Sequence, residues 1–224
     1  MPERVIALDG PAGSGKSTTA TAVAEKLGWG HLDSGALYRA LTLAALDANV
    51  PDNADRIVSL ARSLPVRLSL AGHGFRPEVA GVDVSRAIRE PRVNQRVSAI
   101  SALPAVREWV NAELRAAAAQ HPAGVVIDGR DIGTVVFPDA GLKIFLTASG
   151  EERAKRRSRE VEQLGGERSV TKVRADLERR DSADSTRAVA PLAAAPDALV
   201  LDGTTLSFPE QVDAVIRLAL KVFP

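Results

Sequence analysis

Residues 10–17, Gly-Pro-Ala-Gly-Ser-Gly-Lys-Ser, form the segment with the clearest chemistry in this chain. They match the spacing G-x-x-x-x-G-K-[ST], in which a glycine-rich turn presents successive backbone N–H groups to a phosphate. A short apolar run, Val5–Asp9, precedes the turn and a helical pattern, Lys16–Leu27, follows it. The turn therefore opens onto the positive end of a helix dipole, which favours anions. A nucleoside triphosphate site is predicted here, and a chance glycine-rich turn is the less favoured alternative.

The side chains of this loop have separate expected roles. Lys16 is placed to reach the β- and γ-phosphates, and the Ser17 hydroxyl is placed to bind Mg²⁺. The remaining positions contribute mainly backbone groups. The predicted triphosphate-binding residues are Gly10, Pro11, Ala12, Gly13, Ser14, Gly15, Lys16, Ser17 and Thr18.

A second acidic position follows another apolar run, Val125–Asp128. Asp128 would position Mg²⁺ at the strand end, unless the strand simply ends at a polar residue. No Glu follows it as in many ATPase motors, and no Asn is followed by Lys as in the guanine-reading motif of GTPases. Arg130 suits an acceptor phosphate better than water activation, because its guanidinium binds phosphate through two parallel hydrogen bonds. Phosphoryl transfer to a small molecule is favoured.

Charged residues recur at helical spacing later in the chain. Arg180, Asp184 and Arg187 are spaced i, i+4 and i+7, so one helix face presents them together. A surface ladder of salt bridges is the alternative for this set. Arg153 and Arg157 are also four residues apart, and a solvated helix explains them equally well.

Four segments together resemble the bacterial cytidylate kinases, a group of nucleoside monophosphate kinases. They are residues 6–11, 32–39, 128–138 and 187–192, which read IALDGP, LDSGALYR, DGRDIGTVVFP and RAVAPL. The resemblance implies transfer of the γ-phosphoryl group of ATP to CMP or dCMP, with Mg²⁺ as the metal ion. An AMP, UMP or shikimate kinase, and a nucleotide-dependent binding module without transfer activity, are the alternatives.

The resemblance also implies site residues. Those that would aim the acceptor or neutralise the transferring group are Lys16, Arg39, Arg130, Arg153 and Arg157. Those that would bind the acceptor are Ser34, Arg39, Ser98, Arg107, Arg130, Asp131, Arg180, Asp184 and Arg187. Within this set, Ser98, Arg107 and Asp131 would read the cytosine edge, and Arg180 and Asp184 would hold the sugar hydroxyls. Ser17 and Asp128 would serve the metal.

Short apolar strands alternate with helices, which predicts an α/β fold of the P-loop NTPase type, its parallel sheet covered by helices on both faces. The expected parallel strands are Val5–Asp9, Val125–Asp128, Leu142–Leu146 and Ala198–Leu201. The expected helices are Lys16–Leu27, Ser34–Leu46, Ala54–Leu64, Arg92–Ala102, Ala105–Ala119, Glu151–Gln163, Thr171–Ser185 and Pro209–Val222.

The alternation of apolar and polar residues at 66–70 predicts a small antiparallel meander, which we assign to the monophosphate-binding region. We expect a single kinase domain over residues 1–224. Its core would span about 1–63, 93–150 and 167–224, its insertion about 64–92, and its lid about 151–166.

The overall composition narrows the possible partners. The 224 residues include 29 Lys and Arg against 28 Asp and Glu, and no Cys, which excludes disulfides and thiolate metal sites. This balance and the scarcity of aromatic residues argue against nucleic acid as a partner. Arg makes up 23 of the 29 cations, which reflects either GC-rich coding or phosphate-binding forks.

Several further expectations concern location and the remaining polar residues. The longest stretch without Asp, Glu, Lys or Arg is 116–127, too short for a spanning helix. We therefore expect a cytoplasmic monomer that binds small-molecule nucleotides and no membrane. The three histidines, His31, His73 and His121, lack metal-ligand spacing and are interpreted as structural or exposed.

Overall fold

The computed structural model describes residues 3–72, 74–163 and 169–224, so His73 and part of the expected lid lie outside the described residues. Its elements in chain order are β1 (Glu3–Asp9), α1 (Lys16–Leu27), β2 (Gly30–Asp33), α2 (Ser34–Asp47), α3 (Ala54–Ser63), β3 (Val66–Ala71), β4 (Gly74–Val79), β5 (Val82–Asp83), the 3₁₀ helix η1 (Ala87–Arg89), α4 (Pro91–Ser101), α5 (Pro104–Ala118), β6 (Val125–Asp128), the π-helix η2 (Ile132–Val136), β7 (Ala140–Thr147), α6 (Gly150–Gln163), α7 (Val170–Thr186), β8 (Leu199–Asp202) and α8 (Phe208–Val222).

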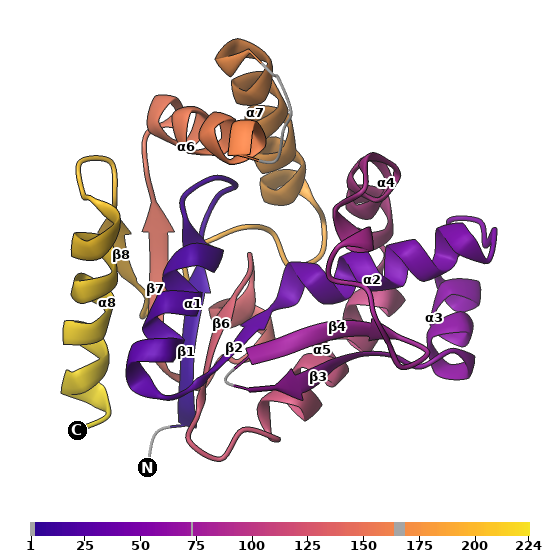
Figure 1. Cartoon of the computed structure of the whole chain (residues 1–224), viewed down its shortest axis with the longest axis horizontal. Coiled ribbons are helices and arrows are strands. Elements are labelled where there is room, and N and C mark those ends of the chain that lie inside the picture. The colour runs from indigo at the N-terminus through magenta and orange to yellow at the C-terminus, as the bar shows by residue number, and fades with distance from the viewer. Residues whose placement is uncertain (1–2, 73, 164–168) are drawn as a thin grey trace.

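One sheet runs through the molecule in the order β3-β4-β2-β6-β1-β7-β8, with β5 paired to β4. Strands β2, β6, β1, β7 and β8 are parallel, so their carboxyl ends meet at one edge of the sheet. The glycine-rich turn, Asp33 and Asp128 all lie at that edge. In Figure 1, α6 and α7 lie above the tip of β7, over the same edge.

The central strand β1 divides the core into two layers, because its side chains alternate between the two faces of the sheet. Val5 and Ala7 belong to the cluster that includes buried residues of α2 to α5, whereas Ile6 and Leu8 belong to the cluster shared with α1 and α8. All four side chains are almost fully buried. The predicted α/β fold with helices on both faces is confirmed.

The structure adds one parallel strand to the four that were predicted. β2 has only four residues, Gly-His-Leu-Asp, and a single apolar side chain, so no strand pattern marks it. Its pairing with β6 places Asp33 beside Asp128. The predicted meander is an antiparallel hairpin, β3–β4, with β5 at its end, but it is no separate unit, because β4 continues the central sheet by pairing with β2.

Within the described residues, no helix is both long enough and apolar enough to cross a bilayer.

Candidate active site

The glycine-rich turn adopts a backbone that other residues would not tolerate. Gly10 has a φ of 146°, and a Cβ there would lie 2.0 Å from the carbonyl oxygen of Leu146 on β7. Gly15, with a φ of 91°, is the residue from which α1 begins. Strand β1 and helix α1 thus fix both ends of the turn, as the motif predicted.

Lys16 is buried beneath the turn. Its Nζ donates to the carbonyl of Pro11 at 2.7 Å and lies 3.4 Å from the Ser14 hydroxyl. Its pKa lies well below the usual value, first because the group is buried and then because the charge of Arg130 repels it. Only the carboxylates of Asp128 and Asp9 oppose this shift among its main causes. An anion bound in the turn would supply the missing negative charge.

Asp128 is the centre of a chain of polar contacts at the sheet edge. Its Oδ2 accepts from the Ser17 hydroxyl at 2.5 Å, and its Oδ1 lies 2.7 Å from His31 Nε2. The other ring nitrogen of His31 lies 3.1 Å from the Thr21 hydroxyl on α1. Burial raises the pKa of Asp128, but the contacts with His31, Ser17 and Lys16 outweigh burial and hold the pKa below its usual value.

His31 was interpreted from the sequence as structural or exposed, and its contact with Asp128 gives it a more specific place. Burial lowers its pKa, but the carboxylates of Asp128 and Asp33 outweigh this, so the pKa lies above the usual value. The pKa of Asp33 is raised by burial and by the charge of Asp128. A sequence signal was available only in hindsight: His31 precedes Asp33 by two residues, so both side chains point to one face of the strand.

A group of cations lies next to the turn. The pKa of Arg180 is lowered to about 10, first by burial and then by the charges of Arg130 and Arg39, with a smaller contribution from Arg157. The pKa of Arg39 is also lowered, by burial and by the charge of Arg157 among others. These four arginines and Lys16 come from α1, α2, the segment after β6, α6 and α7. Their mutual repulsion indicates a site for a multiply charged anion.

A buried ion-pair network lies beside this cation group. Arg107 on α5 donates to Asp131 Oδ2 at 2.5 Å, with side chains only 3% and 7% exposed. Arg187 NH2 lies 3.5 Å from the other oxygen of Asp131 and its NH1 lies 3.6 Å from Asp184. Asp184 in turn accepts from Arg130 Nε at 2.9 Å. The network joins the predicted base-reading residues to the predicted phosphate-binding ones.

Unsatisfied polar atoms surround Asp131. The Tyr38 hydroxyl and Arg107 Nε are both buried without a hydrogen-bond partner, and the Arg107 guanidinium lies 5.5 Å from the Tyr38 ring centroid. Because buried donors without partners cost free energy, they mark a place where a ligand with acceptor atoms fits.

The comparisons with known proteins decide the family. The cytidylate kinase family model matches residues 6–221 of this chain. This protein is a member of the cytidylate kinase family. A cytidylate kinase from Desulfitobacterium hafniense (strain Y51) is 48% identical over 214 residues, which cover 95% of this chain and 91% of the relative. One from Pseudomonas savastanoi pv. phaseolicola is 47% identical over 221 residues, covering 97% and 96%.

Membership of the cytidylate kinase family confirms the resemblance and the nucleoside monophosphate kinase class that it implied. The fold is also found beyond the close relatives. A crystal structure from Chloroflexus aurantiacus, only 14% identical, aligns over the whole of both chains with a TM-score of 0.50. None of these matches favours the alternative AMP, UMP or shikimate acceptors.

Two serines that cytidylate kinases are expected to use differ in their surroundings. Ser34, at the start of α2, is buried, and its hydroxyl donates to the Asp128 carbonyl at 2.8 Å. Ser98 lies on the exposed surface of α4, one turn before Ser101. The Ser101 carbonyl, rather than Ser98, accepts from Arg107 at 3.0 Å. Contact of Ser98 with a base stays a prediction.

Arginines of α6 hold the turn by its carbonyl groups. Arg153 donates to the Ala12 carbonyl at 2.8 Å and pairs with Asp181 of α7, whose other oxygen accepts from the Ala12 N–H. Arg156, which was not among the predicted site residues, donates to the Ser14 carbonyl at 3.1 Å and to the Gly203 carbonyl at 2.6 Å. In this structure Arg153 and Arg156 support the turn, and the predicted contacts of Arg153 and Arg157 with ATP stay predictions.

Asp9 joins the turn to the segment that follows β6. It is the last residue of β1, and its carboxylate accepts from the N–H groups of Ile132 at 2.8 Å and Gly133 at 2.7 Å, the first two residues of η2. It is 5% exposed. Burial raises its pKa from 3.8 to about 6 against the lowering effect of these two hydrogen bonds.

This shift predicts a pH dependence of stability. Because the folded-state pKa is the higher one, the contribution of Asp9 is fully present below pH 3.8 and is lost as the pH rises through about 6. A shift of about two units corresponds to roughly 3 kcal/mol. Urea unfolding of the wild type and Asp9→Asn between pH 4 and 7 measures this: the free energy of unfolding should fall less with pH in the variant. Parallel curves would contradict the assignment.

Proposed function

We propose that this protein transfers the γ-phosphoryl group of ATP to CMP and dCMP, giving ADP and CDP or dCDP. The observation that carries the proposal is the arrangement of cations from the phosphate turn to a buried Arg–Asp pair. Lys16 lies at one end, Arg130 and Arg180 lie between, and Arg107 with Asp131 lies at the other. Two phosphate-bearing molecules and one polar base match this order of charges.

The donor side would bind ATP at the turn between β1 and α1. Its backbone N–H groups and Lys16 would hold the phosphates. The Ser17 hydroxyl and the Asp128 carboxylate are hard oxygen donors in direct contact, which suits Mg²⁺, an ion commonly bound by one or two protein oxygens together with substrate phosphates. We therefore assign these two residues to Mg²⁺, which would neutralise charge on the transferring phosphoryl group.

The acceptor side would bind the monophosphate through arginines. Arg39 and Arg130 would hold its phosphate, and Arg180 with Asp184 would hold the sugar. In the ligand-free chain, Arg39 donates to Asn94 at 2.5 Å and Arg130 donates to Asp184 at 2.9 Å. These partners orient the guanidinium groups before the substrate arrives, which reduces the entropy lost on binding.

The chemical step would need positioning rather than a covalent intermediate. An ionised acceptor phosphate already carries a nucleophilic oxygen, so no general base is required for in-line transfer. The protein would bring the two phosphates together, exclude water and stabilise the negative charge that moves between them. The five cations listed above for the anion site are suited to that task.

Base selection would depend on Asp131. A carboxylate accepts from the 4-amino group of cytosine but repels the carbonyl that uracil has at this position. Arg107 and Arg187 hold both carboxylate oxygens, which limits the rotation of Asp131. A site with fixed buried polar groups can reject an analogue that leaves them unpaired by several orders of magnitude.

The Asp131→Asn variant tests this assignment. The amide keeps the shape of the side chain but can turn its NH₂ group toward the uracil carbonyl. We expect kcat/KM for CMP to fall and the ratio of CMP to UMP activity to narrow by about tenfold or more. The exposed Asp55→Asn serves as the control. An unchanged ratio in Asp131→Asn would refute the role in base selection.

A panel of acceptors tests the function itself. CMP, dCMP, UMP, AMP and shikimate are each supplied with ATP and Mg²⁺, and ADP release is followed. CMP and dCMP should be the preferred acceptors. ATP binding without acceptor-dependent ADP formation would instead support the binding module without transfer activity.

A further inference from the structure

The π-helix η2 is too short to be stable by itself. It has five residues, and the bonds that close it run from the N–H groups of Val135 and Val136 to Asp131 and from Phe137 to Ile132. Starting a helix costs more free energy than one turn returns, so such a segment needs outside support. Its first N–H groups and its last carbonyls lack partners within the helix and must find them elsewhere.

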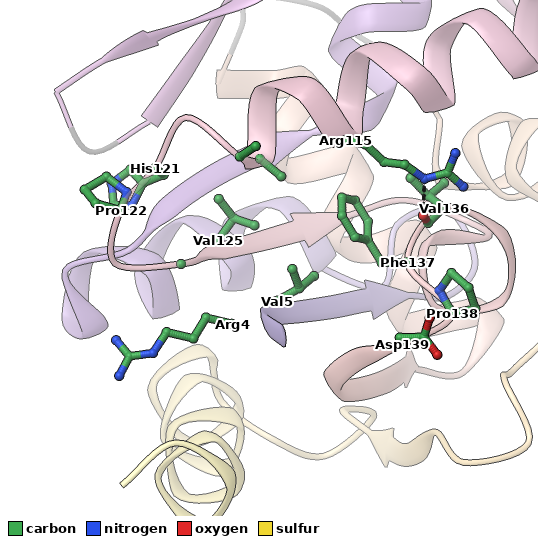
Figure 2. Close-up of a pocket in the computed structure, with 13 residues that line it drawn as sticks. Arg4, Val5, Arg115, His121, Pro122, Val125, Val136, Phe137, Pro138 and Asp139 are labelled. Carbon is green, nitrogen blue, oxygen red and sulfur yellow. Dashed lines mark hydrogen bonds between the residues drawn. The ribbon is translucent and has the colours of Figure 1, made fainter. Parts of the chain in front are cut away.

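Both ends of η2 have such partners. At the N-terminal end, the buried carboxylate of Asp9 accepts from Ile132 and Gly133. At the C-terminal end, Arg115 of α5 donates from Nε to the Val136 carbonyl at 2.8 Å and from NH2 to the Val135 carbonyl at 3.0 Å. Figure 2 shows the Arg115 guanidinium directed at Val136.

Arg115 lies far along α5 from the base-reading end of that helix. Arg107, which pairs with Asp131, lies eight residues before it and on the same helix face. Arg115 itself lines a cavity of about 550 Å³ formed by the starts of β1 and β6, the end of α5 and the residues that follow η2. This cavity lies at the amino edge of the sheet, opposite the phosphate turn, so Arg115 has no direct access to a nucleotide.

We propose that Asp9 and Arg115 are positioning residues for the acceptor, which hold η2 from its two ends and thereby fix Arg130 and Asp131 immediately before it. The inference rests on the proposed function. Asp9 also precedes Gly10, so the residue that supports the acceptor segment is joined to the ATP-binding turn. A displacement of about 1 Å in a reacting complex can cost about a hundredfold in rate, which gives remote support of this kind a measurable effect.

The Arg115→Met variant is the sharper test, because Arg115 contacts neither the phosphate turn nor the acceptor-binding residues named above. We expect KM for CMP to rise about tenfold or more, kcat/KM for CMP to fall by about tenfold to a hundredfold, and KM for ATP to change less than twofold. Arg115→Lys retains one donor and should lie between the variant and the wild type. The exposed Arg56→Met on α3 is the matched control.

Two readouts separate positioning from simple destabilisation. Hydrogen exchange of residues 130–137 should be faster in Arg115→Met than in the wild type, and the CMP to UMP activity ratio should narrow. Asp9→Asn should produce the same changes, and the double variant should lose less than the product of the single losses, because both residues act through one helix.

The possible contrary results are distinct. If Arg115→Met and Arg115→Lys lower the melting temperature but leave KM for CMP and the activity ratio of the folded enzyme unchanged, the inference is wrong. An equal rise of KM for ATP and CMP would also overturn it. Failure of the wild-type enzyme to phosphorylate CMP would defeat the proposed function instead, and the exchange experiment would still report whether Arg115 holds η2.

Discussion

Replacing Lys16 with methionine is expected to lower kcat for CMP phosphorylation by about 10³-fold. Loss of one preorganised group that stabilises transition-state charge costs about 10²–10³ in rate, and phosphoryl transfer relies almost entirely on such groups. Lys16 is buried, and the resting structure holds its Nζ on the Pro11 carbonyl, within the turn itself. Methionine preserves most of the side-chain volume, so the turn should keep its shape while the charge is removed.

The measurement is kcat and KM for both substrates, with ATP affinity determined separately by calorimetry. Lys221→Met, which removes an exposed lysine at the end of α8, is the control and should retain the wild-type rate. ATP binding should weaken in Lys16→Met, but by a smaller factor than the rate, since the contact strengthens in the transition state. A variant with a near-normal rate would remove Lys16 from the catalytic residues.

The parts of the site that lie within short segments could be predicted from the sequence. A strand, a glycine-rich turn and a helix start are adjacent in the chain, so their motif fixes how Lys16 and Ser17 are presented. Asp128 could be added because carboxyl ends of neighbouring parallel strands share an edge, and β1 and β6 are indeed paired. The main fold followed for the same reason: strands buried on both faces have a distinct apolar pattern.

The parts that depend on pairing between distant segments could not be predicted. His31 contacts Asp128 because β2 pairs with β6, and β2 was not recognised as a strand. Asp9 was interpreted only as the end of a strand, since its function depends on a π-helix 123 residues later that has no periodic pattern. Arg156 resembled other charged residues on a solvated helix, and only the packing of α6 over the turn distinguishes it.

The Arg130→Met variant should lower kcat/KM for CMP by about 10³-fold, because this arginine would hold the acceptor phosphate both before and during transfer. Its Nε is held by Asp184 and its NH1 by the Gly129 carbonyl at 3.2 Å, so the guanidinium is already oriented. Arg130→Lys keeps the charge but loses the bidentate geometry, and should recover only part of the activity. The exposed Arg62→Met on α3 is the control.

ATP affinity distinguishes an acceptor role for Arg130 from a general effect of its charge. In the wild type, the charge of Arg130 lowers the pKa values of Lys16 and Arg180. Its removal therefore favours the charged form of Lys16, and ATP binding should be retained or strengthened. If Arg130→Met weakens ATP binding as much as it weakens CMP binding, Arg130 serves the donor as much as the acceptor. A large loss confined to CMP, partly restored in Arg130→Lys, would place the acceptor phosphate between Arg130 and the turn.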